Sequence, residues 1–316
     1  MHSASQPAGW KLLLAFAIIY LVWGSTFLAI RIGVSEVPPF LLAGMRFLVA
    51  GVVLYLWMRT RGAPSPTKHE WGSATLLAVL IFVGDYGLVF WSERRVPSGL
   101  TAVMLATIPV FMTLSEIVVM KTQRLTVRLA AALLIGIGGV CVLVSPTAGL
   151  KDAPVDAIGA CALIVAAISW SAATPLTRKL SLPSDKAMSS AAQMFAGGVL
   201  LTLVASALGE FHGFRWQSVS PKAWLALAYL IVAGSIVAFT AYVWLLHHES
   251  PTKVGTYAYV NPVVAVLLGH FFADEALGPR TILGTALVLV SVVVITTTPK
   301  GIAPTRAKGV AALVEQ

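Results

Sequence analysis

Two charged residues, Arg46 and Asp85, lie inside long apolar stretches of the sequence, where a charge needs an explanation. Insertion scales put the cost of such a residue near the middle of a bilayer at about 2.5–3.5 kcal/mol. The guanidinium of Arg46 could bind a carboxylate of a substrate, or it could cap backbone carbonyls or pair with an acid. Asp85 could exchange a proton or bind a cation in a buried cavity, or it could be the ion-pair partner of Arg46.

Polar and aromatic side chains inside similar apolar stretches complete a candidate site. Tyr257 and Asn261 are four residues apart, which places them on one face of a helix. Tryptophan and tyrosine also anchor helices at membrane interfaces, but Trp23 and Trp170 lie deeper in their stretches than that alternative requires. The candidate substrate-binding residues are Trp23, Ser25, Thr26, Arg46, Asp85, Tyr86, Met104, Thr107, Trp170, Tyr242, Tyr257 and Asn261.

The elements that position these residues are expected to be membrane-spanning helices. Apolar residues make up 58% of the 316 residues and charged residues only 11%, against about 25% in soluble domains. A helix needs about 20 apolar residues to cross the hydrocarbon, and backbone polar groups in lipid must be satisfied within the segment. Short connections that carry charges or prolines, such as "SERRVPSG", separate the apolar stretches. The sequence predicts ten transmembrane helices, near residues 12–30, 39–58, 71–92, 99–120, 127–146, 156–177, 187–208, 222–246, 253–273 and 280–298.

The chain contains an internal repeat of five spans. Trp23 and Trp170 lie 147 residues apart, and later in the chain Trp71 and Trp224 lie 153 residues apart. Because each copy holds an odd number of spans, the second copy enters the bilayer upside down relative to the first. Inverted repeats around a shared cavity are typical of secondary transporters. We therefore expect an all-α polytopic membrane protein with one five-helix repeat at residues 12–150 and a second, inverted one at 151–298.

Two prolines, Pro109 and Pro262, occupy corresponding positions in the fourth and ninth predicted spans. Each removes one backbone hydrogen bond from its helix and bends it. A symmetric pair of bends beside a central cavity could act as a gate. Alternatively, these prolines make static kinks that only shape the packing, which transmembrane helices tolerate.

Several classes of function are disfavoured by what the sequence lacks. It has no H-E-x-x-H, G-x-S-x-G or phosphate-loop motif and no dinucleotide fingerprint. We therefore expect no enzyme activity, no cofactor, no metal site and no ATP-driven pump in this chain alone. The net charge of +9 does not indicate nucleic-acid binding, because the basic residues sit in short loops between spans. About twice as many Lys and Arg residues flank the side that holds the N-terminus, which predicts that both termini are cytoplasmic.

Several segments resemble the EamA-type transporters of the drug/metabolite transporter superfamily. They are "VWGSTFLAIRIG", "PPFLLAGMRF", "VPSGLTAVMLATIPVF" and "SPTKVGTYAYVNPVVAVLLGHFFADEAL". The resemblance covers nearly the whole chain, from residue 12 to residue 298. It implies ten helices in two inverted repeats, no cofactor, and export or exchange of small organic molecules across the cytoplasmic (inner) membrane of a bacterium. It does not imply a particular substrate.

The function expected from the residues and the resemblance together is secondary transport by alternating access. The cargo would be a small organic metabolite, with an amino-acid-like solute favoured. Export of drug-like or cationic toxic compounds is the alternative, for which Asp85 is the one deep acid in the sequence. A receptor without transport and an integral-membrane enzyme are less favoured. The expected partners are the small-molecule substrate, membrane lipid and a proton as candidate coupling ion, and the sequence indicates no particular oligomeric state.

Overall fold

The protein is an assembly of long apolar helices in a computed structural model that describes residues 9–119, 124–144, 155–177, 179–249, 254 and 256–298. No strand occurs in these ranges. The helical elements are α1 Gly9–Val34, α2 Pro39–Thr60, α3 Lys68–Ala78, η1 Val79–Gly87, α4 Leu88–Ser92, α5 Ser98–Leu105, α6 Ile108–Leu114, η2 Ser115–Val119, α7 Val127–Val144, α8 Ala157–Thr177, α9 Lys186–Ala207, η3 Trp216–Ser218, α10 Pro221–Tyr229, η4 Leu230–Val237, α11 Ala238–His248, α13 Tyr257–Ala273 and α14 Pro279–Thr297.

The lengths and compositions of these helices fit a membrane protein. Within the described residues, eight helical stretches are long and apolar enough to cross a bilayer, and two further apolar helices, Val127–Leu143 and Tyr257–Ala273, are shorter. Lys68–Ser92 and Pro221–Tyr242 are each one stretch, although each contains a π-helical segment, η1 and η4 respectively. The expectation of an all-helical membrane protein is therefore confirmed.

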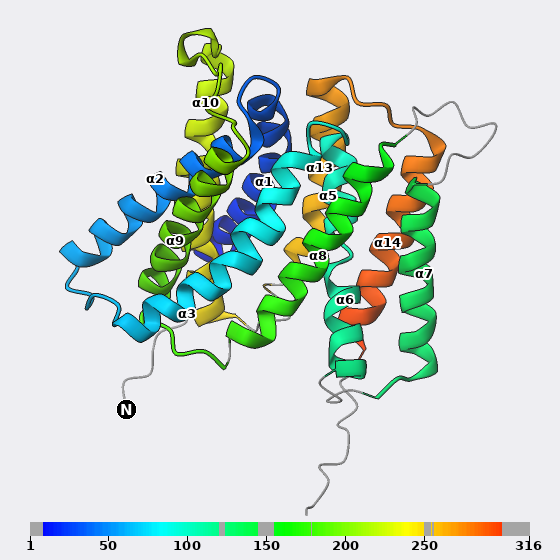
Figure 1. Ribbon diagram of the computed structural model, residues 1–316. Helices are drawn as coiled ribbons and strands as arrows, with labels where there is room; N and C mark the ends of the chain where they lie inside the picture. The colour runs from blue at the N-terminus through cyan, green and yellow to red at the C-terminus, as the bar shows by residue number, and fades with distance from the viewer. Residues whose placement is uncertain are drawn as a thin grey trace, which may run out of the picture.

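Helices α2 and α9 pack along each other at very short range. A Cβ atom on Gly51 would lie 2.7 Å from the Cα atom of Phe195, and one on Gly44 would lie 2.6 Å from the hydroxyl of Thr202. A Cβ atom on Gly198 would lie 2.5 Å from the Cα atom of Leu48. Residue numbers thus fall along α9 as they rise along α2, so the two helices run antiparallel (Figure 1). Small residues allow this close approach, which stabilises helix pairs in lipid through van der Waals contact.

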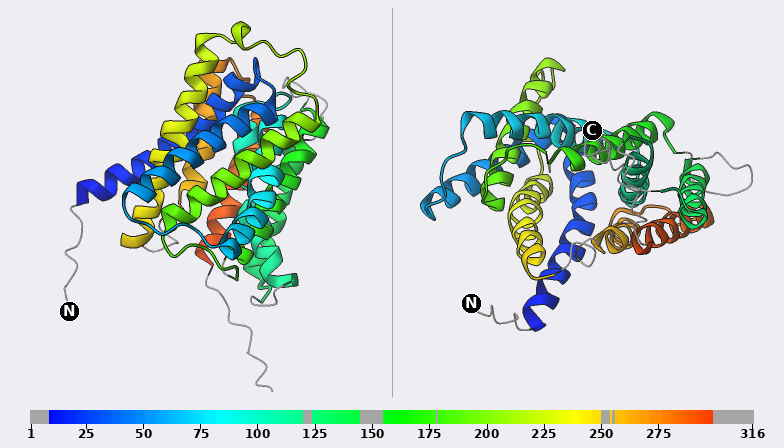
Figure 2. Two further views of the ribbon diagram at one scale, coloured as in Figure 1. Left: turned by 60° about the vertical axis from the view of Figure 1, so that its left-hand side comes forward. Right: turned by 90° about the horizontal axis from the view of Figure 1, so that it is seen from below.

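A second antiparallel pair, α7 and α14, lies at one edge of the bundle (Figure 2). Gly136 faces Ser291, and a Cβ atom on Gly139 would lie 3.0 Å from Val288. The hydroxyl of Ser291 donates to the carbonyl of Ala132 at 2.7 Å, so this polar group is satisfied inside the pair. The candidate site residues lie on other helices, and this pair is peripheral to them.

The bundle has two ends, which we name for their relation to the N-terminus. The near end is where α1 and α3 begin, with the start of α3 toward the bottom of Figure 1, and the far end is where α1 ends. Three helices that begin at the far end are capped by glutamates from remote segments. The carboxylate of Glu275 accepts hydrogen bonds from Ser98 N at 2.6 Å, Ser98 Oγ at 2.7 Å and Gly99 N at 2.9 Å, at the start of α5. Glu210 accepts from Leu41 N at 2.8 Å, at the start of α2.

Glu36 provides the third of these caps. It accepts hydrogen bonds from the backbone N and the hydroxyl of Ser220, both at 2.6 Å, at the start of α10. These hydrogen bonds lower the pKa of the Glu36 carboxyl below its ordinary value. Burial raises the pKa of Glu210, against the effect of its bonds to α2. A fourth helix that begins at the far end, α8, is capped locally, because Asp156 accepts from Gly159 N at 2.6 Å.

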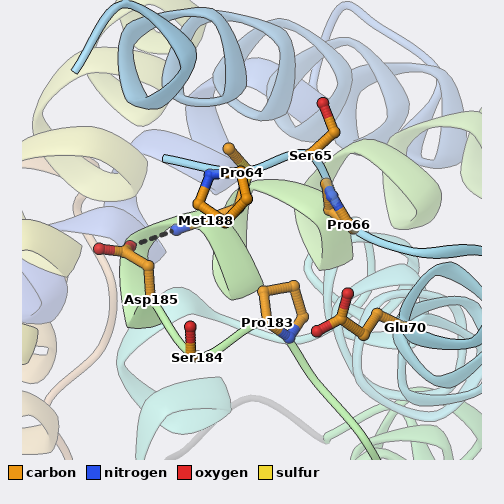
Figure 3. Close-up of a pocket in the computed structure, with 8 residues that line it drawn as sticks. All are labelled: Pro64, Ser65, Pro66, Glu70, Pro183, Ser184, Asp185 and Met188. Carbon is orange, nitrogen blue, oxygen red and sulfur yellow. Dashed lines mark hydrogen bonds between the residues drawn. The ribbon is translucent and has the colours of Figure 1, made fainter. Parts of the chain in front are cut away.

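Two helices that begin at the near end are also capped locally. Thr67 and Glu70 form a capping box at the start of α3. Asp185 accepts from Met188 N at 2.9 Å at the start of α9, as Figure 3 shows. The two loops enclose a cavity of about 30 Å³ that is lined by Pro64, Ser65, Pro66, Glu70, Pro183, Ser184, Asp185 and Met188. Ligand pockets are usually about 300–1,000 Å³, so this one is too small for a metabolite.

Candidate functional site

Arg46 on α2 reaches across to the π-helical segment η4. Its side chain is 3% exposed, and its Nε donates to the hydroxyl of Ser235 at 3.0 Å. The same hydroxyl donates to the carbonyl of Leu230 at 3.0 Å, which fixes its orientation. The Nη1 atom of Arg46 is buried and has no hydrogen-bond partner among the described residues. The guanidinium therefore keeps donors free for a further acceptor.

Aromatic rings surround this guanidinium. Its Cζ atom lies 4.7 Å from the ring centre of Phe47 and 5.5 Å from that of Tyr86. The Tyr86 ring in turn lies 6.0 Å from that of Trp170 on α8. Such rings attract a cation through their electron-rich faces and also exclude water. They hold Arg46 in place without consuming its hydrogen-bond donors.

Asp85 precedes Tyr86 in the π-helical segment η1. Its side chain is 4% exposed, and its Oδ1 has no hydrogen-bond partner among the described residues. Both Asp85 and Arg46 are described, and no ion pair joins them. This conformation therefore lacks the ion pair between Asp85 and Arg46 that was one of the two predictions for Asp85.

Three aromatic residues from α1, α11 and α13 form a second cluster. The ring of Trp23 lies 5.3 Å from that of Tyr242 and 5.0 Å from that of Tyr257. The two tyrosine rings are 6.1 Å apart in an edge-on arrangement. Tilted and edge-on contacts of this kind are the preferred geometries of aromatic pairs. The structure thus brings together three candidates from positions far apart in the sequence.

Gly234 connects the aromatic cluster to Arg46. Its carbonyl accepts a hydrogen bond from Trp23 Nε1 at 3.1 Å. A Cβ atom at this position would lie 3.3 Å from Arg46 Nη2 and 2.9 Å from Thr26 Cγ2. A π-helical segment disturbs the regular backbone hydrogen bonding of an α-helix, and here one of its carbonyls binds a side chain. Glycine leaves room for Trp23, Thr26 and Arg46 to meet at one point.

The other half of the chain repeats part of this arrangement. The hydroxyl of Ser169 on α8 donates to the carbonyl of Leu80 in η1 at 2.8 Å. This contact resembles that between Trp23 and Gly234, because in both a side chain from a neighbouring helix donates to a backbone carbonyl of a π-helical segment. Position 235 is a serine, whereas the residue 153 positions earlier is Phe82. The polar contact of Arg46 consequently has no counterpart at Phe82.

Four of the predicted site residues make contacts elsewhere. The hydroxyl of Ser25 lies 2.6 Å from that of Tyr229. Met104 is fully buried in the apolar core, and the hydroxyl of Thr107 donates to its carbonyl at 2.6 Å. The side-chain amide of Asn261 fits its neighbours when its nitrogen faces two backbone carbonyls. It then donates to the carbonyls of Tyr257 and Tyr20, both at 3.2 Å. These contacts give Ser25, Met104, Thr107 and Asn261 packing partners but do not link them to Arg46.

The two predicted gating prolines differ in their surroundings. Pro109 stands near the start of α6, directly after a break between α5 and α6 at residues 106–107. Pro262 lies inside the continuous helix α13. The two helices are therefore not bent in the same way, and a gating role for either proline stays a prediction.

Sequence reasoning missed two residues of this region. Gly234 lies in an apolar run and carries no chemical group, so only the close approach of Arg46 reveals its role. Glu93 belongs to the connection "SERRVPSG", where a charge is expected to face water, yet its side chain is fully buried. Within the described residues, no cluster of three His, Cys, Asp or Glu side chains could hold a metal ion.

A separate cavity of about 370 Å³ opens at the far end. It is lined by Pro39, Trp91, Arg94, Arg95 and Glu210. Arg95 lies over the ring of Trp91 at 4.5 Å, and its Nη1 is 3.7 Å from Asp156 Oδ2. This volume falls within the usual range for a small-molecule pocket.

Comparisons with known proteins place the chain in a family. The model of the EamA-like transporter family matches residues 10–145 and again residues 157–297. An "uncharacterized inner membrane transporter YedA" of Escherichia coli (strain K12) is 34% identical over 285 residues, covering 89% of each chain. An "uncharacterized transporter YoaV" of Bacillus subtilis (strain 168) is 23% identical over 282 residues, covering 88% of this chain and 94% of that one.

The fold is similar to that of a protein of known crystal structure. The two chains superpose with a TM-score of 0.58 at 22% identity, over 91% of this chain and 97% of the other. The family and both relatives are described as transporters, so the protein is a membrane transporter and not an enzyme. On the evidence of its two matching segments and its relatives, the chain belongs to the EamA-like transporter family.

Proposed function

We propose that the protein is a secondary transporter that exports or exchanges a small, carboxylate-bearing organic metabolite by alternating access. The observation that carries this proposal is the buried Nη1 of Arg46, which has no partner among the described residues. A guanidinium binds a carboxylate through parallel N–H donors, and its own neighbours leave those donors available. An amino-acid-like solute would satisfy the guanidinium and place its apolar part against the nearby rings.

The architecture proposed for this function is ten transmembrane helices in two inverted five-helix repeats, at residues 12–150 and 151–298. Eight long spans and two shorter apolar helices are compatible with that number. The family model matches the chain twice. The antiparallel contact of α2 with α9 also supports inversion, because Gly51 and Gly198 are 147 residues apart, as are Leu48 and Phe195. Gly51 contacts Phe195, and Gly198 contacts Leu48. Replacing each residue by its counterpart 147 residues away converts one contact into the other, as a two-fold axis requires.

The proposed location is the cytoplasmic membrane of a bacterium, with both termini in the cytoplasm. The relative from Escherichia coli is described as an inner membrane transporter. The excess of Lys and Arg in the loops at the near end supports a cytoplasmic position for that end. The far end, with its open cavity, would then face outward.

A second candidate function is the export of cationic compounds, and the unpartnered Oδ1 of Asp85 favours it. The same oxygen also makes Asp85 a candidate for proton coupling. A buried carboxylate would bind a cation strongly because little water competes with it. Arg46 and Asp85 thus make opposite predictions about the charge of the substrate.

A thermal-shift screen of the purified protein tests both candidates, because a ligand that binds the folded state raises its melting temperature. We expect carboxylate solutes to stabilise the wild type but not Arg46→Gln. Gln193→Ala is the matched control, since Gln193 lies 147 residues after Arg46 and bonds only to Ser189 in the described structure. Retention of the carboxylate shift by Arg46→Gln would remove the basis of the proposal. A shift with cationic dyes that Asp85→Asn abolishes would favour the second candidate.

Transport itself is tested by counterflow of a labelled solute in proteoliposomes. A carrier loaded with unlabelled solute accumulates labelled solute transiently, whereas a receptor does not. The ligand found in the thermal-shift screen is the solute to use. Binding without counterflow would contradict alternating access while leaving the site intact.

A further inference from the structure

Glu93 is a fully buried carboxyl group that the proposed transport site does not use. It follows α4 at the far end, and its exposed fraction is 0%. Neither Oε1 nor Oε2 has a hydrogen-bond partner among the described residues. An ionised carboxylate without water, hydrogen bonds or a paired cation is strongly unfavourable. In this conformation the group should therefore be neutral.

The cation that interacts electrostatically with the Glu93 carboxyl among the described residues is held in a different contact. A guanidinium nitrogen of Arg31, on α1, donates to the backbone carbonyl of Glu93 and makes no ion pair with its carboxylate. The neighbouring residues Arg94 and Arg95 are exposed and line the far-end cavity. Asp156, at the start of the adjacent α8, lies near Arg95. Because Arg31 already bonds to the backbone of Glu93, its guanidinium could pair with the Glu93 carboxylate after a small rearrangement.

A second acid, Glu275, opposes ionisation of the Glu93 carboxyl. Glu275, which follows α13, has its carboxylate bound by the start of α5 and interacts electrostatically with Glu93. Two negative charges that interact electrostatically favour a proton on one of them. Glu275 already accepts three hydrogen bonds, whereas the Glu93 carboxyl has no hydrogen-bond partner among the described residues, so the proton belongs on Glu93. Burial raises the pKa of the Glu93 carboxyl well above its ordinary value, Glu275 raises it further, and Arg31 lowers it.

We propose that Glu93 is a proton-binding site at the far end: it holds a proton while Glu275 is bound to α5, and it releases that proton when this contact opens. On opening, the O–H bond of the acid breaks and the proton passes to water at the far end. The resulting carboxylate then pairs with the guanidinium of Arg31. Closing the contact between Glu275 and α5 reverses both steps. The inference extends the proposed transport function, since it names the group that would link substrate movement to a proton gradient.

Infrared difference spectroscopy of the protein in lipid, between acid and alkaline buffer, tests protonation directly. We expect a carboxylic-acid C=O band that persists at pH values where exposed glutamates are ionised. Because Asp85 is buried as well, the comparison is made in an Asp85→Asn background, in which Glu93→Gln should remove the band and Glu70→Gln, at a near-end cap, should not. A band that Glu93→Gln leaves unchanged would overturn the proposal. This measurement needs no transported solute, so its result stands even if the proposed function fails.

A second variant covers the case in which Glu93→Gln does not fold. Glu275→Gln removes the neighbouring negative charge but leaves Glu93 in place. The same band should then disappear at a lower pH than in the wild type, because less repulsion opposes ionisation of Glu93. An unchanged midpoint would mean that Glu275 does not control the proton, which contradicts the coupling that we propose.

Transport provides the third measurement. Glu93→Gln should keep counterflow of the solute but lose accumulation driven by a pH gradient, down to the level of protein-free liposomes. Gradient-driven accumulation at the wild-type rate in Glu93→Gln would exclude Glu93 as the coupling group. Loss of counterflow in the wild type for every solute would count against the proposed function alone.

Discussion

The two ends of the bundle differ in their caps: remote caps occur at the far end, beside the local cap of α8, whereas the caps of α3 and α9 at the near end are local. At the far end, α2, α5 and α10 begin against the carboxylates of Glu210, Glu275 and Glu36, each from a segment more than one hundred residues away in the sequence. At the near end, α3 begins with reciprocal hydrogen bonds between Thr67 and Glu70, and α9 begins against the carboxylate of Asp185, in each case between groups three residues apart. A local cap stabilises one helix. A remote cap also fixes the position of one segment on another, so it must break if those segments part.

In the described conformation, these remote contacts hold separate segments together at the far end. Glu275 joins the end of α13 to the start of α5, Glu210 joins the segment after α9 to α2, and Glu36 joins the segment after α1 to α10. A carboxylate at a helix N-terminus also interacts favourably with the helix dipole. The far end therefore has three electrostatic contacts that a conformational change would have to break and restore.

The largest effect should follow from removing Glu275. Thr101→Cys serves as a reporter in a background without Cys141 and Cys161, because Thr101 is fully buried on α5 near the far end. We expect Glu275→Ala to speed labelling of this cysteine by a maleimide in detergent by at least about tenfold. One hydrogen bond to a charged group is worth about 1.5–3 kcal/mol, and about 1.4 kcal/mol corresponds to a factor of ten.

The matched control for this labelling experiment is Asp185→Ala. It also removes a carboxylate cap, but a local one at the near end. Labelling of Thr101→Cys should stay within about twofold of its background rate, because no far-end contact is lost and a distant substitution should change the free energy of far-end opening by only a few tenths of a kcal/mol. Equal acceleration by both variants would mean that the reporter measures general loosening and not opening of the far end.

A second effect concerns the pH dependence of stability at Glu93. The folded-state pKa is raised, so the folded protein holds a proton that the unfolded chain loses near its ordinary pKa of about 4.3. This contribution to stability is present at low pH and declines as the pH rises from the unfolded pKa toward the folded pKa. The melting temperature of the wild type should therefore fall relative to that of Glu93→Gln as the pH rises. A constant difference between the two across that range would contradict the buried neutral acid.

Much of the fold could be predicted from patterns in the sequence, because an apolar stretch in lipid must form a helix to satisfy its backbone hydrogen bonds. Helix type and approximate span positions depend on composition and length, which local sequence contains. None of the three π-helical segments η1, η2 and η4 was predicted. In η1 and η4 a side chain from a neighbouring helix, Ser169 or Trp23, binds a backbone carbonyl, and such a contact depends on how the helices pack. Periodicity alone gives no sign of them.

The candidate site shows the same division between local and non-local information. Arg46, Trp23, Tyr242 and Tyr257 were named because polar and aromatic residues inside an apolar run are conspicuous, and the structure places the three aromatic residues in contact. Glu93 was not singled out, because it lies among other charges in a predicted connection between two spans. The groups beside its side chain include Arg31 on α1 and Glu275 after α13, which lie far away in the chain, so sequence spacing could not reveal its burial.

A third effect, on stability alone, is expected from Asp185→Ala at the near end. Loss of an N-cap carboxylate costs about 0.5–2 kcal/mol, here through the bond from Met188 N. The melting temperature should fall, and the far-end cavity lined by Arg94 and Glu210 should be unaffected. Asp185→Asn is the rescue variant, since asparagine caps helices nearly as well as aspartate. Failure of asparagine to restore stability would show that Asp185 acts through its charge and not as a cap.

The smallest effect is expected at Glu36, whose carboxylate is fully exposed to solvent apart from its bonds to Ser220. Its pKa is lowered in the folded state, so its contribution to stability is present above the unfolded pKa and disappears as the pH falls through the folded pKa. The melting temperatures of wild type and Glu36→Gln should therefore differ slightly at neutral pH and converge in acid. This sign is opposite to that expected for Glu93, although both glutamates lie at the far end. If the two variants instead responded to pH in the same direction, burial would not be what separates a proton-binding glutamate from a capping one in this protein.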